Sequence, residues 1–491
     1  MGEHTWSWIF FVAYAAAIAG IALWSRARTK NMESFSVGTR TVSPFFIGLS
    51  LAANLTSAAT FVINPGLIYL YGVSGFIGYG IATPLALFIA LAVFTTRFRT
   101  IGDRFTVLTV PQWIGDRYGD RRMTIYFALL SLLQITFLVL IVVGLSVVLS
   151  SALGIPIVAA LLVVIGFTFT YILIGGAGAH ILTNSIQAFI MIAVALMFLG
   201  SGLRFFDGGI GAFFERLAAV GPHFAAATNP DSLLYRDLFE VIVANAVIGI
   251  AIIMQPHVIS KALYLRSARD VRVYLTTAFV VSSLFFLVLA TGLFARLAMP
   301  GELLKPDTVI ATYMVQTFSP FLRAIVVLGI LSAGFSTMEG ILVALSSIFS
   351  NDFLRHVLPR RITASDAWKP RSLMIARVFL VALSPVTFFL SYDQILHPSL
   401  SVAMLAQNGV YGLFSATFVP VLFGIFASHP SKTWAMIASV AAVVVHFGMY
   451  YFEITMYHNN PAVPAACAII TSTVIMGAAT LLARGGGEAR A

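Results

Sequence analysis

Charge is what this sequence has least of. Only 10% of its 491 residues are charged, whereas an ordinary soluble domain carries roughly a quarter. Hydrophobic residues make up 59% of the chain, and its mean hydropathy is +0.95. So few charges cannot cover the surface of a water-soluble protein of this length. The composition therefore excludes a cytosolic enzyme and a disordered chain, and it indicates an all-α polytopic membrane protein.

Reactive side chains are also scarce. The single cysteine, Cys467, excludes an intramolecular disulfide. The apolar runs hold neither paired carboxylates nor histidines at metal-ligand spacing, and an intramembrane enzyme would need such groups. We therefore predict that the protein is not an enzyme and has no catalytic residues and no cofactor.

Thirteen apolar runs are long enough to cross a bilayer, which takes about 20 residues. The predicted spans are Trp6–Trp24, Pro44–Leu70, Gly75–Thr96, Met123–Leu153, Pro156–Ile174, Leu182–Leu203, Leu238–Val258, Leu275–Leu297, Ile310–Phe349, Leu373–Leu390, Leu400–Phe426, Trp434–Tyr450 and Val463–Leu482. The ninth run is too long for one straight span, so it is a tilted helix with a turn attached or two segments. The loop Arg204–Arg236 is expected to hold a short amphipathic helix.

The basic residues are distributed unevenly between the loops. With the N-terminus outside, 23 of the 29 Lys and Arg residues fall in cytoplasmic segments. Lys and Arg are held on the cytoplasmic side of membrane proteins, so we predict an N-out/C-in orientation. The net charge of +10 then reflects topology, and we predict no nucleic-acid partner.

Two spans have irregular sequences at membrane depth. The second crowds small and hydroxylated residues between Leu51 and Thr60 and continues into Asn64-Pro65-Gly66. Asn, Ser and Thr compete with helical hydrogen bonds, and Pro65 removes a donor and bends the chain after it. The segment is either a kinked helix with a small-residue packing seam or an unwound segment whose freed carbonyls bind an ion.

The ninth span is the other irregular one. Ser336 and Thr337 are adjacent hydroxyls with Gly334 before them and Gly340 after them. Oxygen ligands suit a hard cation. These residues are therefore either packing contacts or part of an ion site, at a second broken span.

Four motifs in order along the chain carry a resemblance to the sodium:solute symporter family, over essentially the whole sequence. They are Gly38-Thr39-Arg40 with Ser50–Leu55, Pro65-Gly66 and Tyr71-Gly72; Gly175-Gly176 with Thr183–Gln187; Gln255-Pro256-His257; and Ala333 with Ser336-Thr337, Ser346-Ser347 and Asp352. The Gln255-Pro256-His257 motif resembles the branch that carries proline, pantothenate and monocarboxylates.

The resemblance implies a LeuT-like 5+5 inverted-repeat fold with a solute site near the midplane. Repeat 1 would be residues 44–203 and repeat 2 residues 237–427, with peripheral segments 1–43 and 428–491. The main sodium site would then consist of the carbonyls of Ala52, Leu55 and Ala333 and the hydroxyls of Ser336 and Thr337. Sodium would be the coupling ion and the sole metal.

Two positions depart from the family pattern. Asn184 stands where the family has an acid that contributes to a second sodium site in some members, so we expect one sodium per cycle. Glu339 is the only acidic residue well inside a predicted span, and an intramembrane acid is a functional hypothesis by default. Glu339 either compensates the charge of a cation, couples transport to protons, or is a protonated or paired carboxyl beside a wet cavity.

The predicted activity is sodium-coupled symport of a small organic solute, a monocarboxylate or an amino-acid-like carboxylate, by alternating access. Proposed solute contacts are Asn54, Ser57, Thr60, Gln407 and Asn408. Proline carriers of the family present aromatic residues where this chain has the aliphatic stretch Val247–Ile252, so the resemblance argues against proline itself. Alternatives are a proton-coupled or uncoupled carrier of the same fold, or a transporter-like sensor, for which the segment after Leu482 leaves no kinase domain. We expect a multi-pass protein of the plasma (inner) membrane that functions as a monomer, with the lipid bilayer, the solute and sodium as partners.

Overall fold

The structure is a computed structural model that describes residues 4–26, 32–36, 42–363, 368–397 and 402–488. Throughout these ranges the regular structure is helical, without a β-strand. Eleven helices are long and apolar enough to cross a membrane, or thirteen when each of two sharply bent helix pairs is taken as one span. The prediction of an all-helical protein with many spans is confirmed, and the exact number of thirteen stays a prediction.

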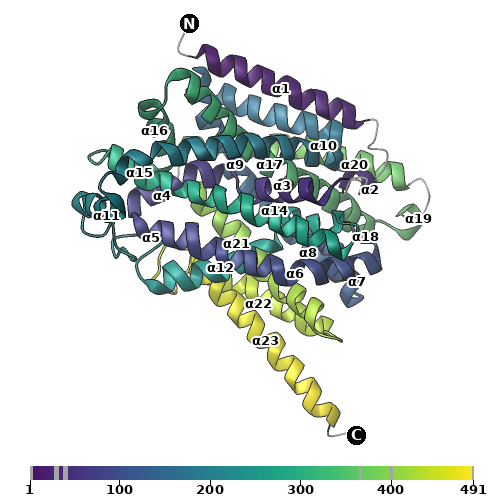
Figure 1. Ribbon diagram of the computed structural model, residues 1–491. Helices are drawn as coiled ribbons and strands as arrows, with labels where there is room; N and C mark the ends of the chain where they lie inside the picture. The colour runs from purple at the N-terminus through teal and green to yellow at the C-terminus, as the bar shows by residue number, and fades with distance from the viewer. Residues whose placement is uncertain (1–3, 27–31, 37–41, 364–367, 398–401, 489–491) are drawn as a thin grey trace.

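Most of the candidate membrane spans are built from helices that stand alone or join end to end with a neighbour, and the long ones pack into one bundle (Figure 1). The main helices of these spans are α1 (Thr5–Arg26), α3 (Pro44–Leu55), α4 (Asn64–Tyr71), α6 (Thr83–Phe105), α8 (Arg121–Leu130), α9 (Gln134–Leu153), α10 (Ile157–Ser201), α12 (Asn245–Ala251), α14 (Ala268–Leu287), α15 (Thr291–Ala298), α17 (Pro320–Ile348), α20 (Trp368–Leu396), α21 (Val402–Phe426), α22 (Lys432–Tyr451) and α23 (Ala462–Glu488).

Shorter helices and turns connect or extend them. The short helices are α2 (Met32–Ser36), α5 (Val73–Gly75), α7 (Val110–Tyr118), α11 (Gly209–Val220), α13 (Pro256–Ile259), α16 (Val309–Thr317), α18 (Arg355–Val357) and α19 (Arg360–Thr363). The 3-10 and π turns are η1 (Ala59–Ile63), η2 (Phe76–Ala82), η3 (Ser131–Leu133), η4 (Leu203–Phe206), η5 (Phe239–Ala244), η6 (Ile252–Met254), η7 (Ser260–Tyr264), η8 (Val288–Ala290), η9 (Pro306–Thr308) and η10 (Phe349–Leu354). Helix α11 is the amphipathic helix expected between Arg204 and Arg236.

The second predicted span is broken, as the unwound interpretation expected. Helix α3 ends at Leu55, and the chain resumes helical geometry at η1 after Thr56–Ala58, with a bend of 52°. The break lies before Pro65, which we had expected to cause the bend. Pro65 instead lies inside the continuous helical segment Ala59–Tyr71, directly after the π-helical turn η1.

The seventh predicted span is broken as well, which the sequence analysis did not expect. The segments Phe239–Met254 and Pro256–Tyr264 meet at 62°. Gln255 between them has an extended backbone (φ −59°, ψ 124°), as the residue before a proline favours. The motif that we placed at the end of this span is therefore its hinge.

The fifth and sixth predicted spans form α10, whose two halves meet at Gly176. Gly176 has φ 57° and ψ −156°, a backbone conformation that residues with a Cβ rarely adopt. The predicted span bounds, Pro156–Ile174 and Leu182–Leu203, put His180 in a loop; it instead lies in the first turn of the second half of α10, so that expectation was wrong.

The ninth predicted span consists of two segments, α16 and α17, one of the two expected alternatives. Helix α17 is continuous from Pro320 to Ile348, so the expected irregularity around Ser336 and Thr337 does not exist. Most of α17 is buried, because it packs against α10, α9, α1 and α3. It lies in the middle of the bundle in Figure 1.

Candidate functional site

The break in the second span exposes the end of α3 to α17. The last four carbonyls of a helix, here those of Ala52 to Leu55, have no partner within it. The Thr56 hydroxyl donates to the Ala52 carbonyl at 2.7 Å, and the Ser336 hydroxyl donates to the Ala53 carbonyl at 3.0 Å. A cluster of inward-facing oxygens therefore forms where α3 stops.

Helix α17 supplies the other side of this oxygen cluster. The hydroxyls of Ser336 and Thr337 reach the Ala333 carbonyl one turn earlier, at 2.8 and 3.3 Å. The Thr337 hydroxyl also lies 3.5 Å from the Asn54 carbonyl. The side chains of Ala333, Ser336 and Thr337 are fully buried, and that of Asn54 is almost fully buried. The structure thus brings the predicted α17 ligands together with the end of α3.

The two predicted ligands on α3 lie at this same helix end. Ala52 is fully buried, and its carbonyl is the one that Thr56 bonds. Leu55 is the last residue of α3 and lines the adjacent cavity. On α3, the carbonyls that the α17 hydroxyls contact are those of Ala53 and Asn54, which lie between the two predicted ligands Ala52 and Leu55.

A cavity of about 90 Å³ lies beside the two broken spans. Ser57 and Thr60 from the first break, Gln255 from the second, and Gln407 from α21 contribute polar groups to its wall. The rest of the wall is mainly aliphatic and aromatic, and none of the described residues that line it is charged. Such a cavity suits a small solute that is held by hydroxyls and amides.

Three of its polar groups form one hydrogen-bonded set. The Gln407 amide donates to the Tyr79 hydroxyl at 2.7 Å, and the hydroxyls of Tyr79 and Tyr411 are 2.8 Å apart. The sequence analysis missed both tyrosines, because nothing in their local sequence shows that η2 faces α21. Gln255, also missed as a solute contact, has a buried side-chain oxygen without a hydrogen-bond partner among the described residues.

The other two predicted solute contacts lie outside this cavity. The amide of Asn54 packs against the amide of Asn184, 2.5 Å away. Asn408 faces α22, where its side chain reaches the Tyr451 hydroxyl at 3.3 Å and its carbonyl contacts His446. The structure therefore groups Ser57, Thr60 and Gln407, and it separates Asn54 and Asn408 from them.

Glu339 is fully buried on α17 and faces α10. The hydroxyl of Thr183 donates to it at 2.6 Å and the amide of Gln187 at 2.9 Å, and the Tyr171 hydroxyl is a third donor. His180 Nδ1 lies 3.2 Å from the same carboxylate. Every contact comes from the two halves of α10, so Glu339 ties α17 to this helix.

Lys261 is a further functional candidate, although it follows the predicted seventh span, Leu238–Val258, and so was expected to be one of the 23 cytoplasmic basic residues. It is only 1% exposed, in η7 beyond the hinge of the seventh span. Its ammonium donates to the Ser50 hydroxyl at 2.6 Å and lies 3.2 Å from His180 Nε2. Nothing in the local sequence distinguishes Lys261 from the basic loop residues that follow it.

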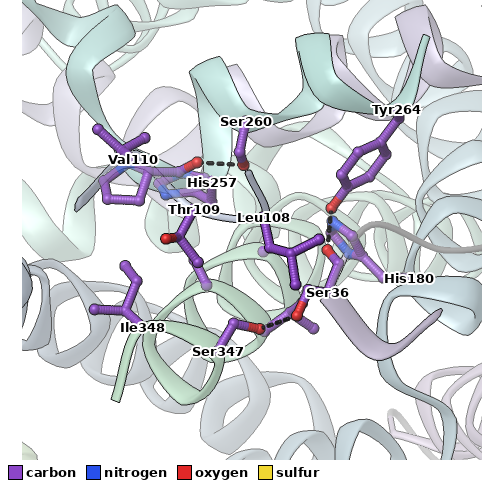
Figure 2. Close-up of a pocket in the computed structure, with 14 residues that line it drawn as sticks. Ser36, Leu108, Thr109, Val110, His180, His257, Ser260, Tyr264, Ser347 and Ile348 are labelled. Carbon is purple, nitrogen blue, oxygen red and sulfur yellow. Dashed lines mark hydrogen bonds between the residues drawn. The ribbon is translucent and has the colours of Figure 1, made fainter. Parts of the chain in front are cut away.

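A second, smaller cavity of about 20 Å³, lined in part by His180, has room for about one water molecule. Figure 2 shows Ser36 of α2 between Ser347 and Tyr264. The Ser36 and Ser347 hydroxyls are 2.8 Å apart, and the Tyr264 hydroxyl donates to the Ser36 carbonyl at 2.9 Å. These contacts close the cavity toward α2, at the end of the bundle where α7 and α18 also lie (Figure 1).

Comparison with solved structures defines the class of fold. A Na⁺-coupled sialic acid symporter, solved in a substrate-bound outward-open state, superimposes with a TM-score of 0.77 over 97% of this chain and 98% of that one, at 16% identity. A nucleobase-cation-symport-1 family transporter in a closed conformation gives a TM-score of 0.53 over 92% and 95%, at 14% identity. At these identities the likeness shows a shared LeuT-type transporter fold.

Sequence comparison then gives the family. The model of the sodium:solute symporter family matches residues 35–442, and the chain belongs to that family. A sodium/pantothenate symporter of Haemophilus influenzae is 23% identical over 93% of this chain and 92% of its own length. A high-affinity proline transporter of Bacillus subtilis is 25% identical over 87% and 89%. The predicted family and the prediction of a multi-pass membrane transport protein are thereby confirmed.

Proposed function

We propose that the protein is a secondary active transporter that couples the downhill movement of sodium to uptake of a small organic solute. The observation that carries this proposal is the approach of the α17 hydroxyls to the open carbonyl end of α3. Family membership and the symporter relatives support sodium as the coupling ion. Neither the family nor the part of the chain that the structure describes points to catalysis.

The proposed sodium ligands are the carbonyls of Ala52, Leu55 and Ala333 and the hydroxyls of Ser336 and Thr337. A helix C-terminus carries partial negative charge, which favours a cation. A bound sodium would be coordinated by carbonyl oxygens of α3 and by oxygens of α17, so it would hold the two helices together. Sodium thereby favours one state of the transporter, which is all that coupling requires.

The proposed solute contacts are Ser57, Thr60 and Gln407, with Tyr79 and Gln255 added from the cavity wall. An apolar cavity of about 150 Å³ binds benzene, which has six non-hydrogen atoms, so the cavity of about 90 Å³ suits a solute of roughly four or five. Short monocarboxylates and small amino acids have this size. Because the wall carries no charge, a solute carboxylate would be held by hydroxyls and amides.

The helix packing supports two inverted repeats, residues 44–203 and 237–427. If each helix of repeat 1 is replaced by its counterpart in repeat 2 and the reverse, the second span corresponds to the seventh, and both of these spans are broken. The same exchange converts the contact of α3 with α14 into that of α12 with α6, and both contacts are extensive. It likewise converts the contact of α10 with α17 into that of α21 with α9. Alternating access would then move one repeat's broken helix against the other's.

The finer assignments are part of the same proposal. Transport would proceed through a monomer with an outside N-terminus, in the plasma membrane. Solute and sodium would enter from the side where α11 lies and leave past the small cavity of Figure 2, toward the end with α2 and α7. Separation of Ser36 from Ser347 and Tyr264 would open that route.

Uptake into liposomes tests the proposal. Purified protein is reconstituted, and labelled lactate, propionate, alanine, pantothenate and glucose are offered under an inward sodium gradient without a proton gradient, and then under the reverse conditions. We expect sodium-driven accumulation of a small carboxylate. Accumulation of the same solute with a proton gradient alone would favour proton coupling, for which the buried Glu339 is the supporting observation.

A further inference from the structure

Three ionisable side chains form a buried chain that the sodium and solute sites do not use. Glu339 on α17 contacts His180 on α10, and His180 contacts Lys261 on η7. Each of these contacts is 3.2 Å, and none of the three side chains is more than 2% exposed. The two ends of this chain are 78 residues apart in sequence and lie on different halves of the predicted repeat 2.

The hydrogen bonds of this chain agree with one assignment of charge. Glu339 receives donors from Tyr171, Thr183, Gln187 and His180, and an ionised carboxylate accepts about four such bonds. A neutral imidazole has one donor and one acceptor nitrogen. With Nδ1–H directed at Glu339, the other nitrogen accepts from the Lys261 ammonium. The arrangement is therefore a carboxylate and an ammonium joined through a neutral histidine.

The surrounding groups resemble a cation site. Two more polar groups, the Ser50 hydroxyl and the Asn184 amide, lie beside the contact between Lys261 and His180. The Ser50 oxygen and the Asn184 amide nitrogen are 3.2 Å apart. With the Asn184 amide turned so that both its atoms are satisfied, it also donates to Glu339 at 3.1 Å. Hard oxygen donors around a carboxylate suit a small cation. Here the cationic partner of the carboxylate is the side chain of Lys261.

We propose that Lys261 is a tethered counter-cation for Glu339 and that its ammonium replaces a mobile cation at this cluster. A buried carboxylate without a compensating positive charge is strongly unfavourable. Lys261 compensates it permanently, so no second ion is needed. Lys261 also holds the end of the hinged seventh span against Ser50 of α3, and it is a positioning residue for the transport cycle.

Charge removal and rescue test this role. Lys261→Ala leaves Glu339 uncompensated, and we expect sodium-driven uptake to fall by about tenfold or more, since loss of one partner of a buried pair is strongly destabilising. Adding Glu339→Gln removes the stranded charge and is expected to restore uptake to within about threefold of the parent at saturating sodium. Lys305→Ala, at an exposed lysine, is the matched control.

Binding of radioactive sodium to the purified protein gives a readout that does not depend on transport. We expect one sodium per chain in the parent protein, a second in Lys261→Ala because the carboxylate and its oxygens remain, and one again in the double variant. If Lys261→Ala fails to fold, recovery of folded protein in the double variant is the expected result. A double variant as impaired as Lys261→Ala in folding and uptake, or one sodium in all three proteins, would overturn the proposal. A parent that binds sodium but drives no solute would instead refute the proposed function.

Discussion

Removal of the two α17 hydroxyls is the perturbation with the clearest expected magnitude. Ser336 and Thr337 supply two of the five proposed sodium oxygens, and both are fully buried. A hydrogen-bond-like contact to a charged group contributes about 1.5–3 kcal/mol, and about 1.4 kcal/mol is a factor of ten in affinity. Ser336→Ala or Thr337→Val alone is therefore expected to raise the half-saturating sodium concentration about tenfold, and the pair about a hundredfold.

The assay is initial uptake into liposomes as a function of external sodium, at saturating solute. Ser346→Ala is the matched control, because the Ser346 hydroxyl bonds back to the Leu342 carbonyl of its own helix at 2.7 Å. This variant should keep the parent's sodium dependence. An unchanged half-saturating sodium concentration in the Ser336→Ala, Thr337→Val pair would refute the reasoning, whatever happened to the maximal rate.

Three further variants separate solute binding from packing. Gln407→Ala removes a polar group from the cavity wall, and we expect the solute KM to rise about fivefold to tenfold while the half-saturating sodium concentration stays the same. Asn408→Ala should leave the solute KM unchanged, because this side chain faces α22; a rise equal to that of Gln407→Ala would contradict the cavity assignment. Gly66→Ala should abolish folded expression, because the added Cβ would lie 1.9 Å from the Pro306 carbonyl oxygen, whereas Gly20→Ala meets no atom within 4 Å and should express normally in a detergent-solubilised size-exclusion assay.

The span pattern was largely predictable because twenty-residue apolar runs are a strong signal. The unwound second span was also predictable, since the side chains of Asn54, Thr56 and Ser57 compete with the helical hydrogen bonds of the backbone. The position of the break differed from expectation because the side chains of Thr56 and Ser57 bond nearby backbone groups where α3 ends, whereas Pro65 lies inside the helical segment that follows. The extended backbone favoured before a proline, applied to Pro256, would have placed the second hinge at Gln255.

The chain of Glu339, His180 and Lys261 could not be predicted from the sequence. Glu339 was noticed because an acid is rare inside a span, whereas Lys261 is one basic residue in a segment rich in them. Their connection depends on the turn at Gly176, which directs His180 toward α17, and on the second hinge, which turns Lys261 into the bundle. Neither the turn nor the hinge produces a periodic pattern in the amino-acid sequence. The polar wall formed by Tyr79 and Tyr411 was missed for the same reason.

Sodium and solute should cross the membrane in the same cycle, because the proposed sodium oxygens join α3 to α17 and Leu55 at the end of α3 also lines the solute cavity. The most direct test measures radioactive sodium influx into liposomes with and without the transported solute. We expect solute to stimulate sodium influx in the parent protein and in Ser346→Ala, and the Ser336→Ala, Thr337→Val pair to lose the stimulation at low sodium. Solute uptake without any solute-stimulated sodium influx in the parent protein would contradict it.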